Sequence, residues 1–232
     1  MMPLQQTIAP PAHLSRFRGI IPPRARRWGL IVITLLCILA LTREVALDYY
    51  RVHGNSMTPT LRPGDYILAD KMAFGKGLPL VGRLFSRDDT PSRSEMVIFA
   101  LHPDKKIYLI KRIVGLPGDT LSMQAGTLYV NHQQLAESYT RHQIDPARDP
   151  GAPSSWHYSY LLPEVQIHQY APTGADWGPI LVPEGVYFVL GDNRNESGDS
   201  RRFGFVRHDE LIAKPIVLLY SNTSNKAATW LR

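Results

Sequence analysis

Residues 109–119 have the sequence LIKRIVGLPGD, a short apolar run that ends in a Pro-Gly-Asp turn signal. Comparable apolar runs lie at 66–68, 96–99, 127–130, 186–190 and 215–220, and turn signals separate them. No long stretch with a period of about 3.6 residues follows residue 50, and 19 prolines and 17 glycines favour many turns. The sequence therefore predicts an all-β or mainly β body.

A segment of different composition divides this body. Residues 133–180 are rich in Pro, His, Tyr and Trp and show weak periodicity. We expect them to form an insert or small second domain between two parts of a β core, residues 48–132 and 181–232. A long irregular loop is the alternative interpretation.

The N-terminal region carries the charge and the longest apolar run. Residues 28–42 contain no charged side chain, which is slightly short of the roughly 20 residues of a membrane span. The run can be completed to Leu47 if Arg43 and Glu44 lie at the interface. We therefore expect a transmembrane anchor at 28–47. A cleaved signal peptide is the first alternative, although its small-x-small cleavage site is poor; a buried helix of a soluble protein is the second.

The charge distribution suggests an orientation for this anchor. Five arginines and no acidic residue lie in residues 1–27, and removing those five from the net charge of +6 leaves +1 for the rest. We expect a basic cytoplasmic tail at 1–27 and a body on the far side of the membrane. A nearly neutral body argues against a nucleic-acid-binding surface.

The histidines and the cysteine give no sign of a metal site. The single cysteine, Cys37, lies in the apolar run, and the eight histidines form no His-x-x-x-His pair. No glycine loop of the phosphate-binding kind is present. We expect neither a metal nor another cofactor.

The first candidate site element is the segment GNSMTPTL at residues 54–61. A serine hydroxyl is a weak nucleophile that needs an adjacent base and a backbone that presents it. Gly54 would allow a tight approach or an unusual φ beside Ser56, and Pro59 would stiffen the far side. An ordinary turn explains the same residues.

The second element is Lys111, which interrupts the apolar run of 109–114. Strand alternation places it on one face with Leu109 and Ile113, where partial desolvation would lower its pKa and make it a usable base. A lysine of an edge strand that reaches into solvent is the alternative.

The third element is the polar segment GDNRNESGDSRRFG at residues 191–204, after an apolar run. It suits either a solvated loop or a set of groups that orients a base.

Together, in this order and spacing, the three elements resemble the sequence boxes of bacterial type I signal peptidases. The resemblance implies a mainly β fold with a barrel-like or sandwich catalytic core, a smaller inserted β region and one N-terminal transmembrane helix. It implies that Ser56 is the nucleophile, Lys111 the general base, and Ser197 the hydroxyl that orients the lysine. It also implies shallow apolar pockets for small side chains, formed by Val52, Met57, Leu61, Leu109 and Ile110.

Two pairs of opposite charge are implied as structural supports, Asp199 with Arg201 and Asp192 with Arg112. Two positions depart from the family pattern. Gly54 stands where many relatives carry a serine that helps to hold the oxyanion, so the oxyanion hole would use the Ser56 amide and another donor. The usual Arg-Gly-Asp box is Arg93-Ser94-Glu95 here, which we expect to be a structural variation.

The resemblance implies a membrane-bound serine endopeptidase that removes signal peptides from translocated precursor proteins after small-x-small sites. Its partners would be secretory precursors and the lipid bilayer, at the inner (plasma) membrane with a periplasmic or outer catalytic domain. An enzyme devoted to one precursor, such as a conjugative pilin, is an alternative. A β-domain that binds signal sequences without cutting them is another.

Overall fold

The computed structural model describes residues 23–75, 90–102, 107–140, 153–221 and 227–231. The chain divides into two compact units, Met1–Leu41 and Thr42–Arg232, and the larger unit is called the body below.

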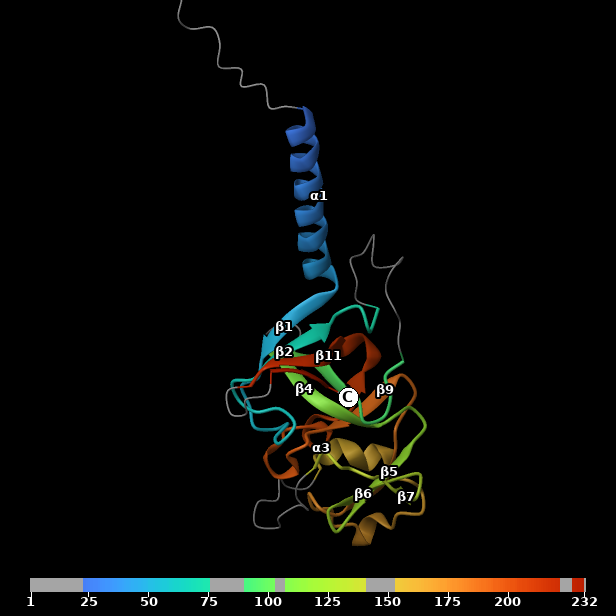
Figure 1. Cartoon of the computed structure of the whole chain (residues 1–232). Helices are drawn as coiled ribbons and strands as arrows, with labels where there is room; N and C mark the ends of the chain where they lie inside the picture. The colour runs from blue at the N-terminus through green and yellow to red at the C-terminus, as the bar shows by residue number, and fades with distance from the viewer. Residues whose placement is uncertain (1–22, 76–89, 103–106, 141–152, 222–226, 232) are drawn as a thin grey trace, which may run out of the picture. The chain divides into compact units, whose positions relative to one another are not determined.

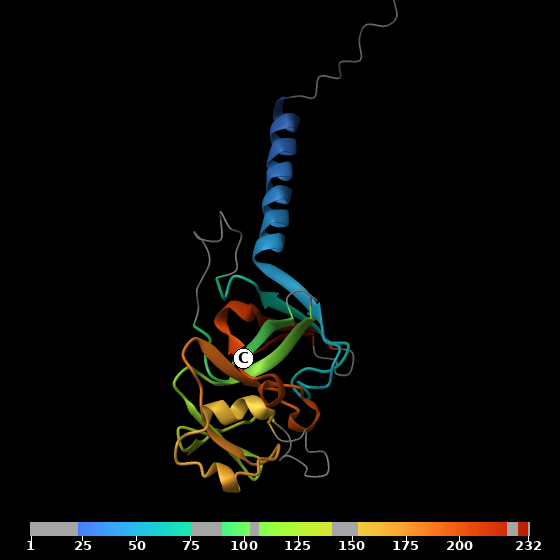
Figure 2. The ribbon, with the colours of Figure 1, turned by 180° about the vertical axis from the view of Figure 1, so that it is seen from behind.

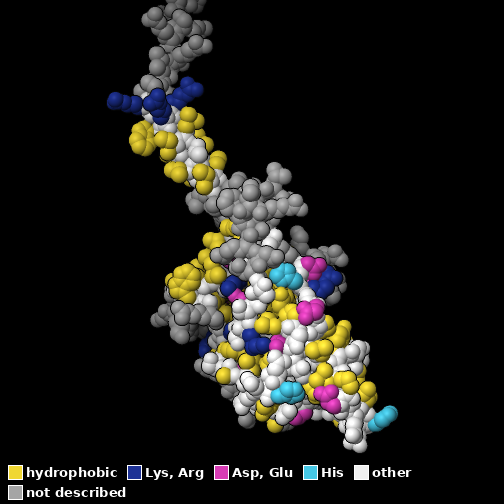
Figure 3. Space-filling view, turned by 90° about the vertical axis from the view of Figure 1, so that its right-hand side faces the viewer, with side chains coloured by type: hydrophobic (Ala, Val, Ile, Leu, Met, Phe, Trp, Pro, Cys, Tyr) yellow, Lys and Arg dark blue, Asp and Glu magenta, His cyan; other side chains and the backbone are white. Residues whose placement is uncertain are grey.

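The N-terminal helix α1 spans Pro23–Val45. Proline suits the first turn of a helix because it lacks an N–H that would be unpaired there. The large apolar side chains from Trp28 to Ile38 are exposed, and Figure 3 shows them along the helix after the basic side chains at its start. Among the residues that the structure describes, no helix is both long and apolar enough to cross a membrane. The side chains of residues 39–45 lie outside the described ones, and Leu47, the last residue of the expected anchor, begins strand β1.

The larger sheet of the body is antiparallel and confirms the mainly β prediction. Its strand order is β1-β2-β11-β3-β4-β9-β10, and β12 also pairs with β11. The bounds are β1 Leu47–Arg51, β2 Tyr66–Asp70, β3 Met96–His102, β4 Ile107–Gly115, β9 Val186–Leu190, β10 Val206–Arg207, β11 Leu211–Tyr220 and β12 Ala227–Trp230. The central place of β4 between β3 and β9 fixes the register of the Lys111 segment from both sides.

A smaller antiparallel sheet has the order β7-β6-β5-β8. Its strands are β5 Thr120–Gln124, β6 Thr127–Val130, β7 Gln133–Gln134 and β8 Trp177–Leu181. Figure 1 shows β5, β6 and β7 together at one end of the body, and Figure 2 shows the same arrangement from behind. The sheet thus combines residues expected in the core, 120–130, with the start and end of the expected insert, 133–180. The domain boundaries stay a prediction.

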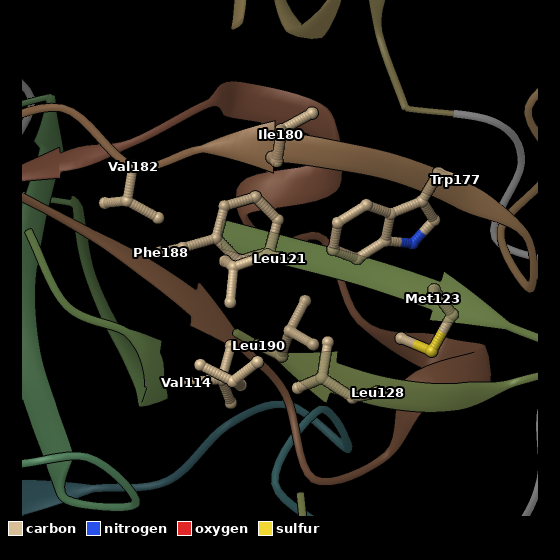
Figure 4. Close-up of a cluster of buried hydrophobic side chains, with 10 residues drawn as sticks. Val114, Leu121, Met123, Leu128, Trp177, Ile180, Val182, Phe188 and Leu190 are labelled. Carbon is tan, nitrogen blue, oxygen red and sulfur yellow. The ribbon is translucent and has the colours of Figure 1, made fainter. Parts of the chain in front are cut away.

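An apolar cluster joins the two sheets. Phe188 of β9 packs against Trp177 of β8, with ring centroids 5.4 Å apart, and Leu121 of β5 is fully buried beside them (Figure 4). Burial of such side chains contributes roughly 1.5–3 kcal/mol each. This cluster therefore fixes β9, and with it the start of the polar segment 191–204.

The rest of the described body is connected by short helical turns. They are η3 Ser155–Tyr160, η4 Ile167–Gln169, η5 Arg194–Glu196, α3 Ser200–Phe203 and η6 His208–Glu210. Part of the segment 133–180 is therefore ordered as strands and turns, and residues 141–152 lie outside the described part.

Candidate active site

Ser56 lies on the turn that connects β1 with β2. Backbone bonds close the turn, from Thr58 N to the Asn55 carbonyl at 3.0 Å and from Leu61 N to the Met57 carbonyl at 2.9 Å. Met57 and Leu61 are buried in an apolar cluster, whereas Ser56 is half-exposed. The apolar side chains hold the turn against the sheet and leave the hydroxyl accessible.

The predicted nucleophile and base are brought together. Lys111 Nζ lies 2.6 Å from Ser56 Oγ and also donates to the Ile110 carbonyl at 2.9 Å. The two residues are 55 positions apart in the chain, and Lys111 is only 3% exposed. The alternative of a solvent-reaching lysine is therefore wrong, because the amine points into the protein.

Burial lowers the pKa of Lys111 from 10.5 to about 8, although the carboxylates of Asp199 and Asp192 act to raise it. Desolvation disfavours the ammonium form, which makes a neutral amine available near physiological pH. A neutral amine next to a hydroxyl can accept its proton. The site is therefore chemically suited to activate Ser56 as a nucleophile.

Asp192 and Arg112 form one of the two predicted ion pairs. Arg112 Nε and Nη2 donate to the two carboxylate oxygens at 2.8 and 2.7 Å, and both side chains are nearly fully buried. Thr60 Oγ1 donates to the same carboxylate at 2.5 Å. The pair therefore connects β4, the Ser56 turn and the polar segment 191–204.

Asp199 and Arg201 form the other predicted pair, bonded twice at 2.9 Å and also fully buried. Asp199 additionally accepts a bond from the Gly191 amide at 3.1 Å. Burial alone would raise the pKa of Asp199, but the charge and hydrogen bonds of Arg201 outweigh it and hold the pKa below its usual value. The carboxylate therefore stays ionised beside the lysine.

Gly191 is a site residue that the sequence prediction missed. A Cβ added there would lie 2.5 Å from the Ser56 carbonyl oxygen and would also meet the side chain of Ser197. Asn193 N donates to the same Ser56 carbonyl at 3.0 Å. The polar segment therefore packs directly against the backbone of Ser56, and only a residue without a side chain fits. The one signal in the sequence was a glycine directly after a buried strand.

The expected tight approach or unusual φ at Gly54 is wrong, and its place beside the oxyanion stays a prediction. Its φ is not in the left-handed region, and nothing lies within 4 Å of a Cβ added to it. Neither a tight approach nor an unusual backbone conformation requires glycine at this position.

Ser197 is buried next to Gly191, but no hydrogen bond joins its hydroxyl to the Lys111 amine. The amine is bonded instead to Ser56 and to the Ile110 carbonyl. An orienting role of Ser197 stays a prediction.

The five residues expected to bind substrate do not share one surface. Val52, Met57 and Leu61 are buried members of the cluster beneath the turn, and Ile110 packs against that cluster. Leu109 packs against a separate cluster. Leu61 has no exposed surface, so its part in this structure is to anchor the turn rather than to contact a substrate.

The family model and the curated relatives agree on one family. The model of the family "Signal peptidase, peptidase S26" matches residues 25–220. The signal peptidase I of Bacillus caldolyticus is 33% identical over 191 residues, which cover 82% of this chain and 88% of the relative. That of Rickettsia massiliae is 30% identical over 214 residues, 84% of this chain and 79% of the relative. A crystal structure of a signal peptidase I from Enterococcus faecalis is 30% identical, with a TM-score of 0.35 over 54% of this chain and 97% of the other.

The buried amine predicts a dependence of stability on pH. Below pH 8 both the folded and the unfolded chain bind the Lys111 proton, so the folded state bears the full cost of the buried charge. Between pH 8 and 10.5 the unfolded chain still holds the proton that the folded chain has released, so the free energy of unfolding rises with pH. Lys111→Met should raise this free energy at pH 7 by up to about 3 kcal/mol. Urea denaturation at pH 7 and pH 10 measures it.

The gain from Lys111→Met should shrink at pH 10. Lys214, whose side chain is 38% exposed and pairs with Glu95, supplies the control, because Lys214→Met relieves no buried charge and should not raise the free energy of unfolding. An equal gain at both pH values for Lys111→Met would contradict the desolvation argument.

Proposed function

The chain belongs to the signal peptidase family, peptidase S26, and is a serine endopeptidase of the signal peptidase I type, and we propose that it cuts with Ser56 as nucleophile and Lys111 as general base. Members of this family remove signal peptides from secretory precursors. The observation that carries the proposal is the 2.6 Å contact between the Ser56 hydroxyl and a buried Lys111 amine.

The proposed reaction has two halves. Neutral Lys111 takes the Ser56 proton while Oγ attacks the scissile carbonyl carbon, and the resulting ammonium gives that proton to the leaving amine as the peptide bond breaks. An ester joins Ser56 to the signal peptide. Lys111 then deprotonates a water that attacks the ester, and the proton returns to Ser56 as the acid product leaves. This is the serine–lysine form of nucleophilic catalysis.

The charged pairs around the site are proposed to keep this geometry. Asp199 with Arg201 and Asp192 with Arg112 are each buried and joined by two hydrogen bonds. Asp192 accepts a bond from Thr60 in the Ser56 turn, and Asp199 accepts one from Gly191, which packs against the Ser56 carbonyl. The Ser56 amide would hold the oxyanion together with a second donor. Cleavage after small-x-small sites is part of the same proposal, and its support is the similarity of residues 50–61 and 109–119 to the family boxes.

A membrane location is also proposed. Its support is the run of exposed apolar side chains from Trp28 to Ile38, together with Arg24, Arg26 and Arg27 at the start of α1. Such a helix is stable in contact with lipid, and basic residues before it favour a cytoplasmic N-terminus. An enzyme held at the membrane would meet its substrate in the same plane, which raises the effective concentration.

Removal of either reacting group should abolish cleavage of a secretory precursor. We expect Ser56→Ala and Lys111→Met each to lose at least about 10³-fold in kcat/KM. The wild-type rate should rise with pH through about 8, as Lys111 loses its proton. The assay is cleavage of a purified precursor by the full chain in detergent. Retained activity in either variant, with the fold verified by circular dichroism, would end the proposal.

Gly191→Ala should also reduce cleavage, by about 10²-fold or more, because the added methyl group displaces the Ser56 backbone. Gly198→Ala is the matched control, since nothing lies within 4 Å of a Cβ at that position and its φ is not left-handed. Equal rates for the two variants would show that the close contact with Ser56 is not needed.

A charge in α1 should weaken membrane association. An aspartate near the centre of a spanning helix costs about 3 kcal/mol, so Leu36→Asp should shift the protein out of the membrane pellet after alkaline extraction. Leu36→Ala should stay in the pellet. Membrane retention of Leu36→Asp at the wild-type level would argue against the anchor.

A further inference from the structure

A buried ion pair connects the segment after β7 with the polar segment of the site. Arg194 Nη1 donates to Glu137 Oε2 at 3.1 Å, and Nη2 is bonded to Oε1. The side chains of Arg194 and Glu137 are 4% and 10% exposed. Glu137 lies in the region 133–180, whose role the sequence left open.

Arg194 is bonded at two further points inside the site segment. Its Nε donates to the Gly191 carbonyl at 3.0 Å, and its own carbonyl accepts a bond from Arg201 Nη2 at 2.8 Å. Gly191 packs against the Ser56 carbonyl, and Asn193 N bonds to that carbonyl. The position of Arg194 therefore determines how the segment lies against Ser56.

The same short segment reaches the second ion pair of the site. The ring of Tyr139 lies over the Arg112 guanidinium, 4.0 Å from Cζ to the ring centroid, and its hydroxyl donates to Glu137 Oε1 at 2.9 Å. Arg112 in turn holds Asp192, which accepts the bond from Thr60 in the Ser56 turn. Residues 137–139 thus contact supports on both sides of the nucleophile.

Glu137 is the largest electrostatic support of the charged Arg194 side chain. Burial acts to lower the pKa of Arg194, but the carboxylate of Glu137, together with Tyr139 and Asp199, outweighs it and holds the pKa above its usual value. Removal of one partner of a buried ion pair leaves the other charge uncompensated, so that side chain must become solvated or change its position. Because Arg194 is bonded to Gly191, its movement would carry the segment away from Ser56.

We propose that Glu137 is a positioning residue of this peptidase, which holds the segment Gly191–Arg194 against Ser56 through Arg194 and so keeps water from the Lys111 amine. This proposal rests on the assignment of Ser56 and Lys111 as the reacting pair. It gives the segment after β7 a part in catalysis without contact with substrate.

Glu137→Ala tests the proposal through the rate and its pH profile, with the full chain in detergent. We expect kcat to fall about 10- to 100-fold with little change in KM, because the reacting atoms are displaced while the substrate still binds. The acidic limb of the pH–rate profile should move above pH 8, because water that enters the site weakens the desolvation that lowers the pKa of Lys111. The opposing charges of Asp199 and Asp192 are unchanged. A merely structural role would not move this limb at a temperature where the variant is folded.

Glu137→Gln preserves the size of the side chain and removes only its charge, so it should show a smaller loss of kcat with the limb displaced in the same direction. Asp209→Asn is the control, because Asp209 also pairs with an arginine, Arg207, but both side chains are more than 60% exposed. Its rate and limb should match those of the wild type.

Two outcomes would overturn the proposal. The first is a wild-type kcat and a wild-type pH–rate profile in folded Glu137→Ala and Glu137→Gln. The second is failure of both variants to fold, which would assign the ion pair to stability alone. If Glu137→Ala alone does not fold, Glu137→Gln decides. Ser56→Ala in the same assay separates this result from the proposed function, because activity that survives in Ser56→Ala would refute the reacting pair itself.

Discussion

The contact between the Ser56 hydroxyl and the Lys111 amine requires a lysine to lie where a lysine is unstable. The amine is bonded to Ser56 Oγ and to the Ile110 carbonyl and is almost completely buried. A charged ammonium in such a place is costly, and this cost is what lowers its pKa to about 8. The reactivity and the destabilisation therefore have the same physical origin. The rest of the site must hold the amine in place and keep it shielded from solvent.

Two buried aspartates complicate this requirement, because a carboxylate near an amine favours the charged form. The structure limits the effect by pairing each carboxylate with an arginine through two hydrogen bonds, Asp199 with Arg201 and Asp192 with Arg112. Each arginine neutralises its partner, so that desolvation remains the larger influence on Lys111. The aspartates can then serve as rigid acceptors, for the Gly191 amide in one case and for Thr60 in the other.

The features predicted correctly from the sequence are those that local patterns determine. The strands follow from apolar runs between turn signals, and the burial of Lys111 follows from its place in such a run. The ion pairs and the juxtaposition of Ser56 with Lys111 came from a family resemblance, since no local pattern specifies a contact across 55 residues. The extent of the smaller sheet was not anticipated, because β5 pairs with β8 across most of the weakly periodic segment 133–180. A close approach was expected at Gly54 but occurs at Gly191, because room for a side chain depends on packing between distant segments.

The Ser56 carbonyl is where these distant segments meet. It faces Gly191, accepts a bond from Asn193, and belongs to a turn whose apolar residues Met57 and Leu61 are fixed in the core. The hydroxyl itself has to remain accessible, so its position can be controlled only through the backbone that carries it. Contacts to a carbonyl achieve this without covering the nucleophile. The smallest residue on one side of the carbonyl and a buried arginine–glutamate pair behind it are therefore two parts of one arrangement, in which residues far from the substrate determine how closely Ser56 approaches Lys111.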